Sequence, residues 1–282
     1  MTRNGVSERI VFLRRRVAIE ARETPGGGPL SALAQTNPRQ PVFGQDYFER
    51  LLQNLGPGSL SEIVPAGPRD VGAAAGFACA LALRAAAARP RAGVVWIAED
   101  MAAREIGLPY GKGLEAQGLD PARLVFVKTR GPSETLWAME EALKSRAVAI
   151  IAESWIAPRA YDLTASRRLL LTARRGGGLG LLLLLRASGA AARLTSAAPL
   201  RFEVAALPPP ILSPPGRGAP LPGPPGWRLR IAKARAGLFG LGEVDPLAWR
   251  DVLFDSDKAM FRHAFSERLP AFAADRPDFA RA

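Results

Sequence analysis

The chain has 282 residues, of which 48% are hydrophobic and 23% are charged, a composition typical of a globular protein that buries a core. Its one cysteine, Cys79, excludes a disulfide framework within the chain and indicates a reducing compartment. Its one histidine, His263, excludes a His-rich metal site, and we expect no metal. The net charge of +12 favours a polyanionic partner, although an Arg-, Ala-, Gly- and Pro-rich composition accounts for part of it.

The apolar segments of the chain do not indicate a signal peptide or a membrane span. The apolar run near the N-terminus is broken by arginines and has no small-residue cleavage site, so we expect no secretory signal. The longest apolar runs, 73–83 and 179–185, are too short to cross a bilayer. We therefore expect a cytoplasmic, nucleoid-associated protein.

The first 42 residues divide into two parts. The first part, 1–23, contains a predicted basic amphipathic helix at 7–23, in which apolar residues at helical spacing flank Arg14, Arg15 and Arg16. Such a helix docks on a partner or packs on its own domain. Residues 24–42 are polar and rich in Gly and Pro, which predicts a flexible linker.

The ordered core is predicted over 43–236, and its opening helix is followed by a strand, a loop and a helix. The strand covers 61–64, the loop 65–72 and the helix 73–88. Gly67 and Gly72 have the spacing of the phosphate loop G-x-x-x-x-G-K-[ST], but Ala73 and Ala74 stand where Lys and Ser/Thr belong. An ordinary strand-to-helix turn fits this spacing equally well.

Solid apolar strands and intervening helices predict a mostly parallel sheet covered on both faces. The strands are expected at 93–97, 123–128, 147–152 and 179–185. One helix is expected from a Ser133 cap to Lys144, with a Glu140–Lys144 pair. Another begins at Asp162 or Thr164 and turns Leu163, Leu169, Leu170 and Ala173 inward.

Carboxylates follow two of these strands. Glu99 and Asp100 come after the first, and Glu153 follows the strand at 147–152. Ligands of open α/β sheets bind at the carboxyl ends of the strands. The alternative is that these acids merely end the strands as solvated groups.

The pattern changes after residue 186. Residues 200–207 and 227–231 alternate between apolar and polar, which predicts half-exposed antiparallel edge strands. Between them, 208–226 is dense in Pro and Gly, so we expect a disordered or polyproline loop, with a PxxP-type docking segment as the alternative. The tail, 237–282, carries Trp249, Phe254, Phe261 and Phe265, and we expect helical pieces in it.

In this order the elements resemble the RecA recombinase core, an α/β fold of the P-loop NTPase type. The resemblance is closer to the ImuA family, RecA-like proteins of inducible mutagenesis, and is distant to the SulA-type cell-division inhibitors. It covers about residues 43–236 and is carried by the run VVWIAEDMAAREIGLPYGKGLEAQGLDPARLVFVKTR and by LWAMEEALKS and DLTASRRLLLTAR.

The resemblance implies an accessory role in SOS-induced, error-prone translesion synthesis. The partners that it implies are an inactive Y-family polymerase-like protein, an alternative replicative-type DNA polymerase and RecA. Glu99 falls at the position of the RecA catalytic glutamate, and Glu153 at that of the Walker B aspartate. Without the loop Lys and hydroxyl, two acids repel a triphosphate, so we expect no ATPase activity and no cofactor.

Two alternatives stay open at this point. One is a weak nucleotide-dependent ATPase or recombination mediator, and the other is a plain DNA-binding module. For weak, salt-sensitive contacts to single-stranded DNA the candidates are basic residues on a late helix and on the last strand, unless these are solvated faces. They are Arg167, Arg168, Arg174, Arg175, Arg228, Arg230, Lys233 and Arg235.

Overall fold

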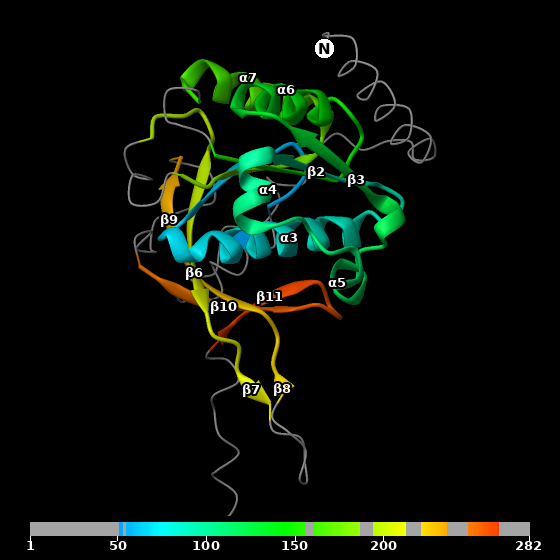
Figure 1. Ribbon diagram of the computed structural model, residues 1–282, viewed down its shortest axis with the longest axis vertical. Helices are drawn as coiled ribbons and strands as arrows, with labels where there is room; N and C mark the ends of the chain where they lie inside the picture. Colours follow the sequence, from blue (N-terminus) through cyan, green and yellow to red (C-terminus); the bar gives the residue numbers. More distant parts are fainter. Residues whose placement is uncertain are drawn as a thin grey trace, which may run out of the picture.

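The computed structural model describes residues 51–52, 55–155, 161–186, 194–212, 221–235 and 248–264. In these ranges a nine-stranded sheet has the order β11-β10-β9-β6-β1-β5-β4-β2-β3, and helices cover both of its faces (Figure 1). The predicted helix at 1–23, the linker at 24–42 and most of the helix at 43–55 lie outside the described residues.

Six neighbouring strands, β3-β2-β4-β5-β1-β6, are parallel. They are β1 (Leu60–Pro65), β2 (Val94–Glu99), β3 (Leu124–Thr129), β4 (Ala149–Ser154), β5 (Leu179–Leu184) and β6 (Leu200–Leu207). All residues of β1, β2, β4 and β5 are buried, as expected for central parallel strands between helix layers. The prediction of a mostly parallel RecA-like sheet is confirmed.

One face of the sheet is covered by α3 (Val71–Ala88), which follows the 3₁₀ turn η1 (Pro68–Asp70). Its Phe77 and Leu81 are fully buried. The stretch Pro68–Ala88 is long and apolar enough to meet a length-and-composition criterion for a membrane span, a criterion that core helices also meet. Here α3 packs against β1, β4, β5 and β6 as a core helix.

The smaller elements α4 (Asp100–Ile106), α5 (Gly111–Ala116) and η2 (Pro121–Arg123) connect β2 to β3. α4 ends at Gly107, whose φ is 79°.

The opposite face is covered by α6 (Pro132–Leu143) and α7 (Leu163–Gly176). Ser133 does not cap α6, because Pro132 occupies the first helical position and Gly131 the N-cap. Asp162 caps α7 by accepting a 2.7 Å bond from the Ala165 N–H, and Gly177, with φ of 74°, ends it. Leu169, Leu170 and Ala173 are buried as predicted, whereas Leu163 in the first turn is 51% exposed.

The C-terminal strands correct two predictions. β6 is not an antiparallel edge strand, because it pairs in parallel with β1 from Ser61↔Leu200 to Pro65↔Val204. β9 (Gly226–Ala234) is antiparallel as predicted, but β10 (Arg250–Asp255) pairs with its other side.

The described part of the tail forms β10 and β11 (Met260–His263), where we predicted helical pieces. These strands belong to the main sheet, so the core extends beyond residue 236. Phe77 of α3 contacts Phe202, Trp227 and Phe261 at ring-centroid distances of 5.3, 5.8 and 5.7 Å. Aromatic packing therefore fixes the tail strands to α3.

The Pro/Gly-rich segment is paired at its base, contrary to the prediction of a disordered or polyproline loop throughout. β7 (Ile211–Leu212) and β8 (Leu221–Pro222) form an antiparallel pair that extends away from the sheet (Figure 1). The rest of this segment, 213–220, lies outside the described residues, so the PxxP alternative stays a prediction.

Candidate functional site

The turn after β1 lacks the geometry of a phosphate loop. Gly67 is extended, with φ of −147°, and the next three residues form η1 instead of a wide loop. The glycines of positive φ in the described chain are 58, 107, 118 and 177, so neither Gly67 nor Gly72 forms the left-handed nest of N–H groups that binds phosphate. Gly72 lies exposed in the first turn of α3, and a Cβ atom added at this position would have no neighbouring atom within 4 Å.

The charges around this turn also oppose a phosphate. Asp70 precedes α3, and its Oδ1 accepts a 2.8 Å bond from the Ala206 N–H of β6. A carboxylate at a helix N-terminus takes the place that favours an anion. Ala74, at the position of the Mg²⁺-binding hydroxyl, is fully buried, and Ala73 is partly buried. At the predicted degenerate loop, Asp70 therefore occupies the place where a phosphate would bind. The sequence-based prediction did not include this residue.

The two acids predicted to match RecA positions, Glu99 and Glu153, lie on opposite faces of the sheet. On β2, Trp96 and Ala98 belong to the cluster under α3, while Val95 and Ile97 belong to the cluster under α6 and α7. Since side chains alternate along a strand, Glu99 points to the α6–α7 face. On β4 the same alternation points Glu153 to the α3 face, beside Ile151. The structure does not bring the two carboxylates together.

Glu99 is bound by its neighbours. Its side chain is 4% exposed, and Oε2 accepts hydrogen bonds from the Ser154 hydroxyl and, at 3.0 Å, from the Trp155 N–H. This carboxylate therefore fixes the end of β4 and the start of the connection to α7.

Glu153 is buried without such support. It is 1% exposed, and burial raises its pKa from 4.5 to about 7, a shift that the nearby Trp96 indole opposes. Neither Glu153 Oε2 nor Trp96 Nε1 has a hydrogen-bond partner among the described residues. Burial, and next the Glu153 charge, raise the pKa of the Cys79 thiol on α3 to about 12, which disfavours the thiolate form.

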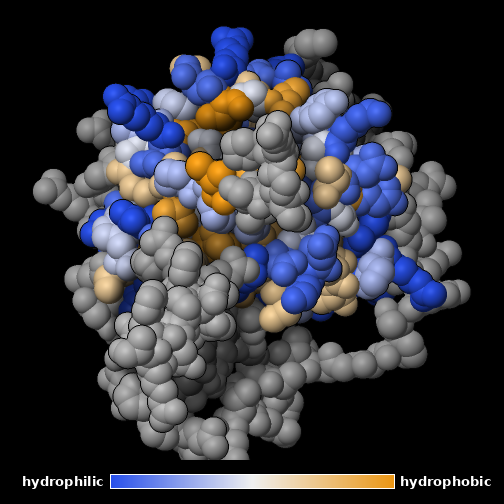
Figure 2. Space-filling model, turned by 90° about the horizontal axis from the view of Figure 1, so that it is seen from below, coloured by the Kyte–Doolittle hydropathy of each residue, from blue (hydrophilic) through white to orange (hydrophobic). Residues whose placement is uncertain are grey.

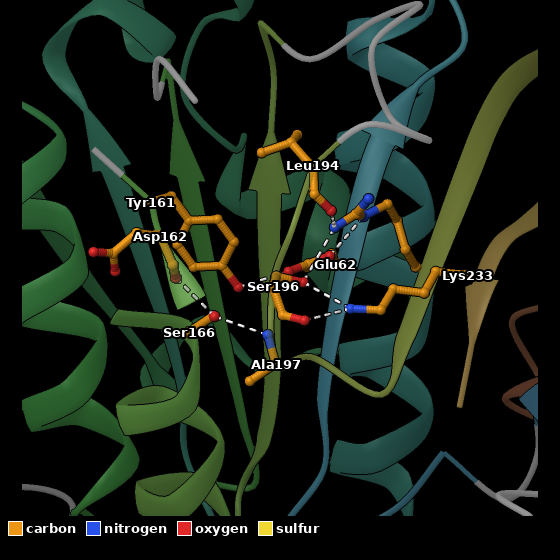
Figure 3. A network of polar contacts seen from close by, with 9 residues as sticks. Glu62, Tyr161, Asp162, Ser166, Leu194, Ser196, Ala197 and Lys233 are labelled. Atoms are coloured by element: carbon orange, nitrogen blue, oxygen red, sulfur yellow. Dashed lines mark hydrogen bonds and ion pairs between the residues drawn. The ribbon is translucent and has the colours of Figure 1, made fainter. Parts of the chain in front are cut away.

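A polar network is buried on the α7 side of β1 and β6 (Figure 3). Arg201 Nε donates to Glu62 Oε2 at 2.6 Å, and the Tyr161 hydroxyl donates to Glu62 Oε1 at 2.7 Å. Arg201 also donates to the Leu194 carbonyl and the Ser196 hydroxyl, and Lys233 Nζ donates to the Ser196 carbonyl at 2.6 Å.

This network organises the crossover from β5 to β6. In its described part, 194–199, the crossover has no helix, and it is held instead by Arg201, Lys233 and the bond from the Ala197 N–H to the Ser166 hydroxyl at 2.8 Å. Glu62 and Arg201 are 0% and 1% exposed, and removing one partner of a buried ion pair costs about 3–5 kcal/mol. The alternation at 200–207 had predicted a half-exposed strand, but Arg201 is a buried partner of Glu62.

The eight candidate DNA contacts fall into two groups. Arg168 pairs with Glu140 at 2.7 Å, Arg228 with Asp251 at 2.7 Å, and Arg230 Nε with Glu203 Oε2 at 2.9 Å. Arg230 also lies 4.8 Å from the centroid of the Trp249 ring, and Lys233 belongs to the buried network. The remaining four are exposed and have no side-chain partner within the described ranges: Arg167, Arg174, Arg175 and Arg235.

Several large apolar side chains are exposed on the described surface. Seen from below, the molecule has hydrophobic residues grouped among hydrophilic ones (Figure 2). Across the described surface the exposed large apolar residues include Met101, Leu108, Tyr110, Ile211 and Leu221. Among the described residues, no group of three His, Cys, Asp or Glu side chains could hold a metal ion.

Together these features define a RecA-like α/β protein whose phosphate-loop position is occupied by a 3₁₀ turn and an acid. No family model matches the chain. Protein ImuA from two strains of Caulobacter vibrioides is 35% identical over 190 residues, which cover 65% of this chain and 72% of the relative. The chain belongs to the ImuA family.

Proposed function

We propose that the chain is a non-catalytic, RecA-like accessory protein of DNA-damage-induced, error-prone translesion synthesis that acts through protein contacts. Membership of the ImuA family supports a role in damage-induced mutagenesis. The partners that we propose are an inactive Y-family polymerase-like protein, an alternative replicative-type polymerase and RecA. We propose that the protein acts in the cytoplasm.

The turn at Asp70 carries the non-catalytic part of this proposal. Phosphoryl transfer needs a loop that surrounds the phosphates, a cation and a metal ligand. Here the turn is a short 3₁₀ helix with an acid tied to β6, and two alanines follow it. Glu99 is already bound to Ser154 and Trp155, and Glu153 lies on the other face of the sheet. The runner-up, a weak ATPase or recombination mediator, has no such support.

Gly72→Glu separates these two functions. The position is exposed and has open space around it, and Glu is favourable near a helix N-terminus, so the variant should fold. A further carboxylate there would repel any triphosphate. We expect wild-type damage-induced mutation frequency from Gly72→Glu in cells that lack the native gene, because nucleotide is not needed.

Calorimetry of the full-length protein supplies the second measurement. We expect no Mg²⁺-dependent ATP binding tighter than roughly millimolar, which corresponds to about −4 kcal/mol. Micromolar binding that Gly72→Glu abolishes, together with lost mutagenesis, would establish the nucleotide-dependent alternative instead. Ala87→Glu, an exposed change in the last turn of α3, controls for the added charge.

A further inference from the structure

Six exposed arginines line the edge of the sheet at which the parallel strands begin. Arg91 precedes β2, Arg146 precedes β4, and Arg174 and Arg175 occupy the last turn of α7, just before β5. Arg89 caps the end of α3, and Arg235 follows the antiparallel β9, which ends at this same edge. We call these residues the arginine edge: Arg89, Arg91, Arg146, Arg174, Arg175 and Arg235.

Hydrogen bonds bring the segments that carry Arg89, Arg174, Arg175 and Arg235 to this edge. Arg89 Nη1 donates to the Gly177 carbonyl at 3.3 Å, which brings the end of α3 to the turn that follows Arg174 and Arg175. The Gly58 N–H donates to the Gly178 carbonyl at 3.0 Å, and the Arg235 N–H to the Pro199 carbonyl at 2.9 Å. The sheet order β9-β6-β1-β5-β4-β2 then carries the row across five strand spacings. At about 4.8 Å per spacing the row is about 24 Å long.

Helix ends alone do not account for this charge. α3, α6 and α7 all end at this edge, and their terminal carbonyls attract cations. Arg123 already serves α3, since its guanidinium donates to the carbonyls of Ala86, Arg89 and Ala92. The acids at the end of α6, Glu140 and Glu141, lie 3.8 and 2.6 Å from Lys144. Arg174, Arg175 and Arg235 have no side-chain partner within the described ranges.

We propose that the arginine edge binds the phosphate backbone of single-stranded DNA without sequence preference. The guanidinium fork matches phosphate oxygens, and one row of cations suits one backbone. The proposal gives the accessory protein a nucleic-acid partner, but it rests on the charge geometry and not on the proposed function. Of the candidates predicted from the sequence it keeps Arg174, Arg175 and Arg235, which carry the proposal because they have no side-chain partner within the described ranges. It sets aside Arg228, Arg230 and Lys233, which are engaged with Asp251, Glu203 and Ser196.

The test is fluorescence anisotropy of the full-length protein with labelled oligo-dT of about 25 nucleotides, in salt from about 50 to about 200 mM. The variant is Arg174→Gln with Arg175→Gln. Its matched control is Arg104→Gln with Arg130→Gln, which removes two exposed arginines at the opposite edge, near the carboxyl ends of β2 and β3. We expect the variant to bind about tenfold more weakly, with a salt slope lower by about 1.4, and the control to bind as wild type.

Three results would overturn the proposal. They are equal losses in the two double variants, absence of wild-type binding at the lowest salt, and equal competition by a duplex of the same length. Thermal melts report whether the variants fold. If Arg174→Gln/Arg175→Gln does not fold, Arg235→Gln takes its place, with an expected slope change of about 0.7. A failure here leaves the mutagenesis result of Gly72→Glu untouched, so the two proposals fail separately.

Discussion

Glu153 is a residue whose charge opposes folding. Its carboxyl group has a raised pKa of about 7 because it is buried under α3, and its Oε2 has no partner among the described residues. Below the unfolded pKa of 4.5 the carboxyl is protonated in both states and costs nothing. As the pH rises from 4.5 to about 7 the folded protein loses stability, and above about 7 the loss is constant. At about 1.4 kcal/mol per unit, the full loss is about 3 kcal/mol.

Glu153→Gln should therefore raise the free energy of unfolding by up to about 3 kcal/mol at pH 8, because it removes the buried charge. The gain should shrink as the pH is lowered toward 5. Urea unfolding at several pH values measures it. Glu99→Gln is the matched control: its carboxylate accepts bonds from Ser154 and Trp155, so this change should destabilise at pH 8. A Glu153→Gln gain that does not change with pH would contradict the buried-charge explanation.

At the same scale, the sequence could predict that acids end β2 and β4 but not the face on which each lies. In AVAIIAES every residue before Glu153 is apolar, so the sequence does not show which side chains face which helix layer until the neighbouring strands and helices are placed. Asp70 was overlooked for a similar reason. Its partner, the Ala206 N–H, is 136 residues away in the chain.

At the scale of elements, the parallel strands were predictable because continuous apolar runs have few other uses. β6 was assigned to the wrong pairing because Arg201 and Glu203 make it alternate as an exposed strand does. Their partners Glu62 and Arg230 are on β1 and β9, so burial of β6 depends on contacts between distant segments. The tail strands β10 and β11 are short, and their pairing also depends on distant segments, so the sequence pattern did not distinguish them from helices.

The tail strands should be essential to the fold, because β10 and β11 belong to the main sheet. Without β10 and β11, β9 would lose one of its two neighbouring strands, and the ring cluster around Phe77 would lose Phe261. We expect a chain ending at residue 247 to lose cooperative thermal unfolding, and one ending at 266 to keep it.

A point substitution tests the same element with less disruption. Phe254 is fully buried and should cost about 3–5 kcal/mol as Phe254→Ala, whereas Met260→Ala, at a side chain 44% exposed, should cost under about 1 kcal/mol. Equal small effects from both substitutions would show that β10 and β11 contribute little to the core.

At the scale of the whole molecule, the described part of the sheet presents two kinds of exposed surface, one apolar and one basic. Apolar side chains such as Tyr110 and Ile211, 71% and 75% exposed, lie on the described surface, and the arginine edge lies at the start of the parallel strands. Exposed aromatic and apolar groups of this kind carry binding energy at interfaces. These surfaces are where we expect the contacts of the proposed accessory function.

The N-terminal segment supplies the last prediction. The sequence predicts a basic amphipathic helix at 7–23 and a linker at 24–42, and a short helix of this kind gains order when its apolar stripe is buried on a partner. A chain that begins at residue 41 should melt as wild type, because the sequence predicts a linker at 24–42 ahead of the core at 43–236. It should bind the polymerase-like partner or RecA more weakly in pull-down assays and lose damage-induced mutagenesis. The triple change of Arg14, Arg15 and Arg16 to Gln keeps the apolar stripe and separates charge from apolar docking. If the shortened chain loses cooperative unfolding, the segment packs on its own domain, and the docking role is wrong.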